Sequence, residues 1–388
     1  MSEPAATRRA AGLRLPFDPL LALAAVGLMA ASLVTLSAST SKDVPGDPHY
    51  YVTRQGVFFA VGTLVAIVLS RIDYSRLREL KYGIYGLMMG GLLLVAVFGG
   101  VTRGSRRAIQ LPFFEVQASE LGKVLLVAAL AAFVVDRSRR LGERDTTARL
   151  VLVAMIPAIF VMASDLGSGL VYIAILFAVL FIAGVGWRHF TGLLGLGAVS
   201  ITLVLVAAPA LGVTVLERYQ VDRLTSFLHP STVAGDAGYQ QNQSRIAIGS
   251  GQKTGRGERA TQGPLNFLPE DRTDFAFAVV GERWGFAGAG FVLSLYALLV
   301  WRGLRILTVA KNLYGALIAG GIVAMLLFQV FINVGMNVGI MPITGIPLPL
   351  LSYGGSSVLS TLLAIGLLQS IYAQGRFAVA TKRRSLPF

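Results

Sequence analysis

Long apolar segments alternate with short polar connections along almost the whole chain. The apolar segments are rich in Leu, Val, Ala and Gly, and none shows the period-two alternation of a membrane β-barrel strand. A helix of about 20 apolar residues crosses the hydrocarbon core of a bilayer and satisfies its own backbone hydrogen bonds. The pattern therefore predicts an all-α integral membrane protein with about ten transmembrane helices, at residues 18–38, 53–69, 82–98, 119–135, 149–163, 167–186, 190–209, 274–300, 312–335 and 356–374.

These segments leave little chain for a separate soluble domain. We expect one polytopic membrane domain over residues 18–375, between an N-terminal tail of residues 1–17 and a basic tail of residues 376–388. Arg8, Arg9 and Arg14 precede the first apolar run, as in a signal peptide. That run, from Leu20 to Ala38, is longer than the about 7 to 15 residues of a signal-peptide core, so we predict an uncleaved first span.

Composition agrees with a membrane location. Of the 388 residues, 54% are hydrophobic and only 14% are charged, and the mean hydropathy is +0.67, outside the range of ordinary soluble domains. The absence of cysteine excludes disulfides and thiolate metal sites. A net charge of +14 could indicate nucleic-acid binding, but the basic residues are spread between the spans and form no single patch, so we expect no nucleic-acid partner.

The basic residues instead predict the topology. They concentrate in alternate connections, at residues 71–81, 137–149 and 302–311, and in the tail after residue 376. The positive-inside rule places these connections and both termini in the cytoplasm. Function is then expected on the opposite, extracytoplasmic side, which carries residues 39–52, 99–118, 210–273 and 336–355.

Two extracytoplasmic segments have distinctive patterns. The long loop of residues 210–273 is polar and Gly-rich but contains apolar residues such as Tyr239 and Ile246, which favour short amphipathic helices resting on the membrane surface. Residues 341–349 are apolar but too rich in Pro for a regular span. We predict that they form a re-entrant loop between the last two spans, buried against protein.

The strongest candidate for chemistry is Asp274, which follows the polar stretch at residues 266–273. Thr273 is a good N-cap residue, so we expect Asp274 in the first turn of the eighth span. A carboxylate there could merely complement the helix dipole. Three further acids and two arginines crowd the same span entrance, which is more than capping requires: Glu270, Asp271, Glu282, Arg272 and Arg283.

Charged residues also occur at other spans. Glu120 and Lys123 are three residues apart in the fourth span and can pair on one helix face. A pair inside a bilayer indicates either a functional site or a structural contact between helices. Asp165, between the fifth and sixth spans, is either a site residue or a solvated turn residue. Arg54 and Arg107 lie at the same outer interface, where a guanidinium suits a phosphate group or a lipid headgroup.

Two patterns favour structural roles. Gln329, Asn333 and Asn337 form one polar stripe on the ninth span, which we interpret as interhelical hydrogen bonding ahead of substrate contact. The Gly-rich segment at residues 249–257 is similar to a phosphate-binding loop, but Gln252 stands where that loop needs Gly, and the segment is predicted to be extracytoplasmic. A nucleotide site is therefore not expected.

Taken in order, several of these segments resemble the SEDS family (shape, elongation, division and sporulation) over nearly the whole chain. The resemblance rests on Gln117-Ala118-Ser119-Glu120-Leu121-Gly122-Lys123, Asp165-Leu166-Gly167, the segment at residues 242–251, Leu268-Pro269-Glu270 with Thr273-Asp274-Phe275, and Gly345-Ile346-Pro347-Leu348-Pro349 with Ser352-Tyr353-Gly354-Gly355. The motif at residues 261–270, Thr261-Gln262-Gly263 with the segment from Leu265 to Glu270, resembles the elongation member RodA more than the division member FtsW. The chain departs from the family at Arg272, Ala108 and Ala118, where His, Trp and Pro are usual.

The resemblance implies a peptidoglycan glycosyltransferase that polymerises lipid II for cell elongation and rod shape. It implies a class B penicillin-binding protein as the crosslinking partner, within the elongation machinery. It also implies that Asp274 is the essential catalytic residue.

The implied reaction suggests a mechanism as a hypothesis. In the donor, the anomeric carbon of the sugar is bonded to a lipid diphosphate, which is already a good leaving group, and the acceptor is a sugar 4-hydroxyl. One base for the hydroxyl and cationic side chains around the diphosphate are therefore enough for an inverting displacement. We assign Asp274 as general base on the acceptor hydroxyl, and Arg54, Arg107 and Lys123, the last held by Glu120, as stabilisers of the diphosphate. Two candidate ligands could hold a divalent cation, Mg or Mn: Glu270 and Asp165. The alternatives are a lipid II flippase and a non-catalytic scaffold for the partner synthase.

Overall fold

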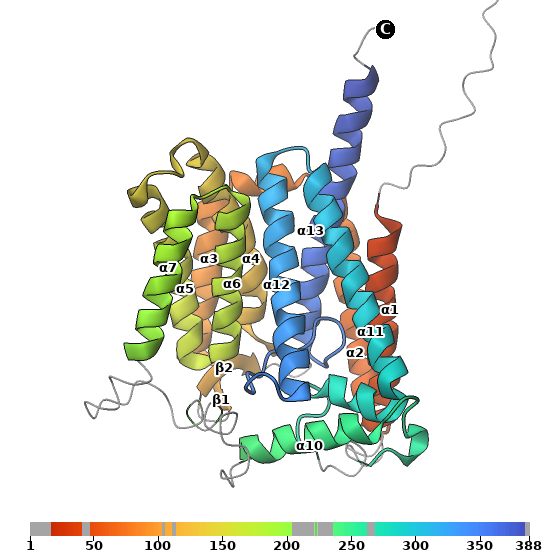
Figure 1. The fold of residues 1–388 in the computed structure, drawn as a ribbon. Coiled ribbons are helices and arrows are strands. Elements are labelled where there is room, and N and C mark those ends of the chain that lie inside the picture. The colour runs from red at the N-terminus through yellow and green to blue at the C-terminus, as the bar shows by residue number, and fades with distance from the viewer. Residues whose placement is uncertain are drawn as a thin grey trace, which may run out of the picture.

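The chain folds into a bundle of long helices that run side by side (Figure 1). The structure is a computed structural model that describes residues 17–40, 47–102, 105–110, 114–203, 221, 223, 236–261 and 268–384. The bundle helices are α1 (Pro19–Ser39), α2 (Tyr50–Arg71), α3 (Lys81–Phe98), α4 (Ala118–Asp136), α5 (Arg144–Ser164), α6 (Leu166–Ile182), α7 (Trp187–Thr202), α11 (Ala276–Val309), α12 (Leu313–Val338) and α13 (Gly355–Arg384).

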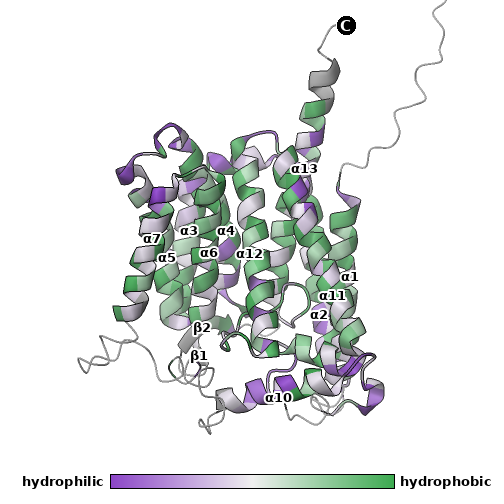
Figure 2. Cartoon of the chain, in the orientation of Figure 1, coloured by the Kyte–Doolittle hydropathy of each residue, from purple (hydrophilic) through white to green (hydrophobic). Residues whose placement is uncertain are grey.

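In the described part of the chain, eight helices are long and apolar enough to cross a membrane, and the shorter apolar α6 and the 16-residue α7 run beside them. The predicted all-α membrane architecture is confirmed, with eight of the predicted spans long enough by themselves. Figure 2 shows hydrophobic residues along the bundle and hydrophilic residues mainly at its two ends. For the seventh span, the structure describes a helix to Thr202, and residues 204–209 of the predicted segment lie outside the described residues.

The two ends of the bundle differ. One end carries the basic connections, with η1 (Tyr74–Arg78) and η2 (Ser138–Arg140). The other end carries α10 (Asp236–Ser250), which lies across the bundle, and η4 (Gly257–Arg259). It also carries an antiparallel sheet in the order β1 (Gly100–Thr102), β2 (Ser105–Gln110) and β3 (Glu115–Val116). The helix α10 confirms a short helix in the long loop, but its apolar residues do not gather on one face, so the predicted amphipathic character is absent from it. The sheet was not predicted.

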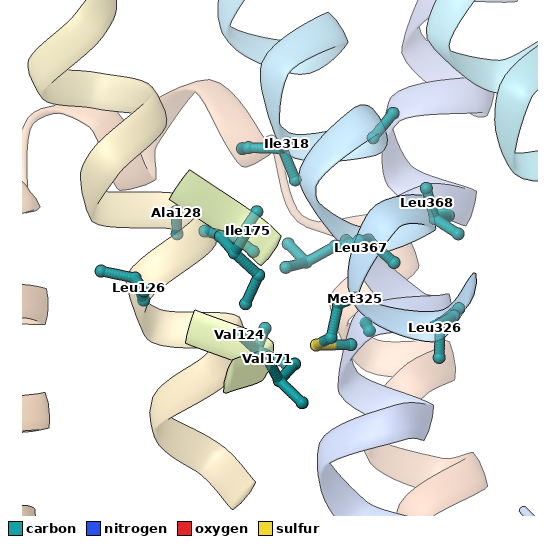
Figure 3. Packing of buried hydrophobic residues seen from close by; sticks show 14 of the residues in the cluster. Val124, Leu126, Ala128, Val171, Ile175, Ile318, Met325, Leu326, Leu367 and Leu368 are labelled. Atoms are coloured by element: carbon teal, nitrogen blue, oxygen red, sulfur yellow. The ribbon is translucent and has the colours of Figure 1, made fainter. Parts of the chain in front are cut away.

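Apolar side chains fill the centre of the bundle. Between α4, α6, α12 and α13, residues such as Val124, Ile175 and Met325 pack together (Figure 3). Small residues allow close helix contact, since a Cβ on Gly321 of α12 would lie 2.8 Å from a methyl carbon of Val127 on α4. The helix α13 continues beyond the bundle at the basic end (Figure 1).

The predicted re-entrant loop is confirmed between α12 and α13. Its apolar side chains are buried, among them Ile346 and Leu348, both 0% exposed. Hydroxyls from two bundle helices satisfy its carbonyls: Ser32 of α1 donates to Leu351 O at 2.8 Å, and Tyr296 of α11 to Pro349 O at 2.7 Å. The loop can therefore lie at membrane depth because protein groups replace the missing backbone partners.

The eighth span differs from its prediction. The helix α11 begins at Ala276, not at residue 274, continues to Val309, and is broken at Gly285 with φ 64° and ψ −158°. The Gly-rich segment explains the break. The carbonyls of Gln252 and Lys253 accept the N–H groups of Phe286 and Ala287, at 2.9 and 3.1 Å. The segment that is similar to a phosphate-binding loop thus caps the second half of α11.

Candidate active site

A cavity of about 560 Å³ opens at the end of the bundle that carries the sheet and α10. Segments far apart in the sequence line it: the start of α2, the β2–β3 region, the α5–α6 junction, the turn before α11 and the re-entrant loop. Among the described residues, its charged lining consists of Arg54, Arg223, Arg272, Glu115, Asp165, Glu270 and Asp274. The cavity therefore combines cationic and acidic groups in one space at the end of an apolar bundle.

Asp274 lies in a tight turn before α11. The N–H groups of Thr273, Asp274 and Phe275 all point to Glu270 O, at 3.1 to 3.2 Å. Thr273 does not cap the helix, because its hydroxyl donates to the Glu270 carboxylate at 2.9 Å. The prediction that Asp274 occupies the first helical turn is therefore wrong by two residues. The turn holds Asp274 at the cavity wall instead of within the helix.

The carboxylate of Asp274 faces the re-entrant loop. A Cβ on Gly345 would lie 3.6 Å from Asp274 Oδ2 and 3.4 Å from Arg223 Nη1. Arg223 is anchored to the same loop, because its Nη1 donates to Thr344 O at 3.2 Å. Gly345 has a φ of 74°, which favours glycine, and its missing side chain leaves the space next to the carboxylate open. An acid and a guanidinium thus lie against one loop residue.

An aromatic wall carries the other arginines. The Arg54 guanidinium lies 4.6 Å from the ring centroid of Tyr50, and that of Arg272 lies 4.4 Å from the ring centroid of Tyr51. Tyr51 packs edge to face on Tyr353. Burial raises the pKa of the Tyr353 hydroxyl, and its hydrogen bond with Arg54 acts in the opposite direction. Guanidinium groups stacked on tyrosine rings are held flat, a geometry that suits phosphate oxygens.

Two of the three residues of the polar stripe on α12, Asn333 and Asn337, serve as predicted, in hydrogen bonding within the protein. Asn333 Nδ2 and Asn337 Nδ2 both donate to the main-chain carbonyl of Asp274, at 2.9 and 3.1 Å. Both side chains are 0% exposed, and neither lines the cavity. These two side chains therefore contact the main chain of Asp274 on the side that faces away from the cavity.

The structure brings most predicted site residues to this cavity. Arg54, Asp165, Glu270 and Asp274 all line it. Asp165 also caps α6, accepting the Ser168 hydroxyl at 2.7 Å, so it is a buried helix cap and not a solvated turn residue. Glu270 has a positive φ of 58°, a strained conformation for this residue type of the kind found near functional sites.

The predicted pairing of Glu120 with Lys123 is confirmed, with Lys123 Nζ 2.6 Å from Glu120 Oε1. Both side chains are almost completely buried, and neither is among the lining residues. Ser360 donates to Glu120 O, whereas Ser356, one helical turn earlier on α13, lines the cavity. Glu120 is therefore bonded one turn of α13 beyond a residue that lines the cavity, and contact of the pair with substrate stays a prediction.

Two predictions receive no support here. The backbone of Arg107 lies in β2, but its side chain is outside what the structure describes. Within the described residues, no group of three or more His, Cys, Asp or Glu side chains is arranged to hold a metal ion. Asp165 and Glu270 alone do not form such a donor set, so we derive no step through a cation.

Arg223, Tyr51 and Tyr353 were missed in the sequence. Arg223 lies in the long loop, and no local pattern links it to the re-entrant loop that it contacts. Tyr51 and Tyr353 meet although about 300 residues separate them. Arg272 was not predicted as a site residue. The available signals were its place two residues before Asp274 and its departure from the family pattern.

Comparisons with known proteins agree with this architecture. The model of the FtsW, RodA and SpoVE family, described as a cell cycle protein, matches residues 15–376. The chain is 34% identical to the peptidoglycan glycosyltransferase MrdB of Escherichia coli K12 over 361 residues, which cover 92% of this chain and 93% of that protein. It is also 34% identical to stage V sporulation protein E of Bacillus subtilis 168 over 338 residues, covering 85% and 89%.

A solved structure is similar as well. It comes from work on the structural coordination of polymerization and crosslinking by a peptidoglycan synthase complex. The TM-score is 0.77 at 30% sequence identity, and the match covers 93% of this chain and 99% of the other.

Proposed function

This chain belongs to the FtsW, RodA and SpoVE family, and we propose that it is a membrane peptidoglycan glycosyltransferase that polymerises lipid II at the cavity around Asp274. The observation that carries the proposal is the joint placement of Asp274, Arg54, Arg223 and Arg272 in one cavity. A relative of similar length, MrdB, is named for this activity.

The residues suit an inverting displacement. The 4-hydroxyl oxygen of the acceptor sugar attacks the anomeric carbon of the donor, and its proton passes to the Asp274 carboxylate. The bond between the anomeric carbon and the lipid diphosphate breaks, and the diphosphate leaves with the electron pair. Arg54 and Arg272, stacked on their tyrosines, stabilise the charge that develops on this leaving group.

The cavity belongs on the extracytoplasmic face. The basic connections lie at the opposite end of the bundle, where Arg78 and Lys81 pair with Asp136 and Lys311 pairs with Asp73. Basic connections favour the cytoplasmic side of a bacterial inner membrane, which also places both termini there. Lipid II then reaches the cavity from the outer leaflet.

The related synthase complex supports a crosslinking partner, and we assign a class B penicillin-binding protein to that place. The chain is equally identical to MrdB and to a sporulation protein, so sequence identity does not distinguish their cellular roles. We favour a role in the elongation machinery, because the motif at residues 261–270 is more similar to RodA.

A lipid II flippase is the competing function, and the packing argues against it. A flippase needs a path through both leaflets, but apolar side chains fill the space between α4, α6, α12 and α13 (Figure 3). The buried polar pair of Glu120 and Lys123 is bonded internally.

Reconstitution separates the possible functions. Purified protein in proteoliposomes is given fluorescent lipid II in the outer or the inner leaflet, and glycan strands and lipid movement are both measured. We expect strands from the wild type, none from Asp274→Asn, and the same lipid movement as in empty vesicles. Movement without strands would instead indicate a flippase. Full activity of Asp274→Asn would remove the catalytic assignment, and a purified wild type that is inactive alone but needed by the partner would indicate a scaffold.

A further inference from the structure

Two buried amides hold the backbone of Asp274 from the side away from the cavity. Asn333 and Asn337 lie one turn apart on α12, and each donates from Nδ2 to Asp274 O. One carbonyl thus receives two donors within a protein interior. Asn337 Nδ2 also lies 2.9 Å from Asn333 O and 3.1 Å from Asn333 Oδ1. Its two N–H groups can therefore serve Asp274 O and one oxygen of Asn333, which ties the two residues together.

The same amides connect the site to its surroundings. Asn333 Nδ2 donates to Ile346 O at 2.7 Å, next to the Gly345 that faces the Asp274 carboxylate. Asn337 Oδ1 accepts the N–H of Ala278 in the first turn of α11, at 3.1 Å. The pair therefore sets the turn of Asp274 against the re-entrant loop, and so fixes two walls of the cavity relative to each other.

The surface helix α10 joins this network. Ser244 is 0% exposed, and its hydroxyl donates to Asn337 O at 2.9 Å. Three residues earlier, Gln241 donates to Met341 O at 3.0 Å. Neither residue lines the cavity. A hydrogen-bonded path thus runs from α10 through the end of α12 to the main chain of Asp274.

We infer that Asn333, Asn337 and Ser244 are positioning residues that aim the Asp274 carboxylate at the acceptor hydroxyl. The inference rests on the proposed glycosyltransferase function. These side chains do not line the cavity, so their loss should act on turnover and not on substrate binding. A displacement of about 1 Å can cost about 100-fold in rate, so a modest shift of the turn is enough to be measured.

The experiment uses the full chain in detergent with lipid II, and measures kcat, KM and thermal stability. The test variants are Asn333→Leu, Asn337→Leu and their combination, together with Ser244→Ala. Two controls match them in type. Gln329→Leu changes the same buried stripe, one turn away, where Gln329 Oε1 has no hydrogen-bond partner among the described residues. Ser250→Ala changes the same surface helix, where the hydroxyl donates to Ala247 O within that helix and to no other described residue.

We expect each Leu variant to lower kcat about tenfold or more, with KM within about threefold of the wild type. The double variant should lose more than the product of the single effects, because Asp274 O then loses both donors. Ser244→Ala should lower kcat about threefold or more, and both controls should match the wild type.

Wild-type kcat in Asn333→Leu and Asn337→Leu would overturn the inference, and so would an equal fall in Gln329→Leu. If the Leu variants do not fold, the two serine variants decide, and equal kcat values for Ser244→Ala and Ser250→Ala overturn it. A wild type that makes no strands refutes the proposed function itself. An active wild type with an inactive Asp274→Asn and fully active Asn variants refutes only the positioning role.

Discussion

Replacing Gly285 with alanine tests how the kink of α11 is built. Gly285 has a φ of 64° and a ψ of −158°, a region that is essentially restricted to glycine. A Cβ there would lie 2.4 Å from Gly255 N and 2.7 Å from Gly251 O. Both contacts are with backbone atoms, so no flexible side chain can move aside.

The magnitude follows from two costs. Backbone strain at such a position costs about 1–3 kcal/mol, and overpacking costs a similar amount, about 1–3 kcal/mol. Gly285→Ala should therefore lower the free energy of unfolding by about 2–6 kcal/mol. If the Gly-rich segment moves away instead, Phe286 and Ala287 lose their carbonyl partners, at about 1–3 kcal/mol each. Either response destabilises the protein.

Gly290→Ala is the matched control. Gly290 lies in the same helix, and a Cβ there would meet nothing within 4 Å. Alanine should be neutral or stabilise that position by up to about 1 kcal/mol, because it is the better helix former.

Thermal unfolding of both variants in detergent, followed by size-exclusion chromatography, measures the difference. We expect a clear loss of melting temperature for Gly285→Ala only. Activity should fall with it, because Asp274 precedes the first part of this helix. Equal melting temperatures for the two variants and the wild type would refute this explanation of the kink.

Three further predictions follow from individual contacts. Glu120→Leu or Lys123→Met alone leaves a buried charge without its partner, so each should lower the free energy of unfolding by about 3–5 kcal/mol, and the double variant should lower it by less. Thermal melting measures this, and equal losses of melting temperature in the single and double variants would contradict it. Arg54→Lys should lower kcat/KM about 10- to 100-fold, because an ammonium cannot reproduce the flat guanidinium stacked on Tyr50, and unchanged kinetics would argue against a role in binding the diphosphate. Burial acts to raise the pKa of Asp73, but hydrogen bonds from Ser75 and Lys311 outweigh it and hold that pKa below its ordinary value. The Asp73 carboxylate therefore stabilises the folded protein at neutral pH, and this contribution is lost as the pH falls through the lowered pKa of the folded state. Between about pH 6 and about pH 3, the wild type should therefore lose more melting temperature than Asp73→Asn, and identical losses would disprove the linkage.

Much of the fold was predictable because each span has to satisfy its own backbone and cover its length with apolar residues. The re-entrant loop was predictable for the same reason, since its prolines forbid a regular helix while its apolar residues require burial. The break at Gly285 was not predictable. It depends on carbonyls of Gln252 and Lys253 that approach from a separate segment, and no local pattern encodes that contact.

The site was predictable where chemistry and local sequence coincide. Asp274 and Glu270 belong to one short polar stretch, and Arg54 opens a span on the same side. Arg223 and the tyrosine wall were not predictable, because they reach the cavity through tertiary contacts over hundreds of residues. The two asparagines of the α12 stripe were read correctly as hydrogen bonding, but their partner, the main chain of Asp274, emerged only from the structure.

The most direct test of the central claim is the polymerisation rate of purified Asp274→Asn with lipid II. Asparagine keeps the size of the side chain and leaves the main-chain bonds to Asn333 and Asn337 in place, but it cannot accept the proton. We predict a loss of about 10²- to 10⁴-fold in rate at unchanged melting temperature. A rate within a few-fold of the wild type would contradict the assignment of Asp274 as the catalytic base.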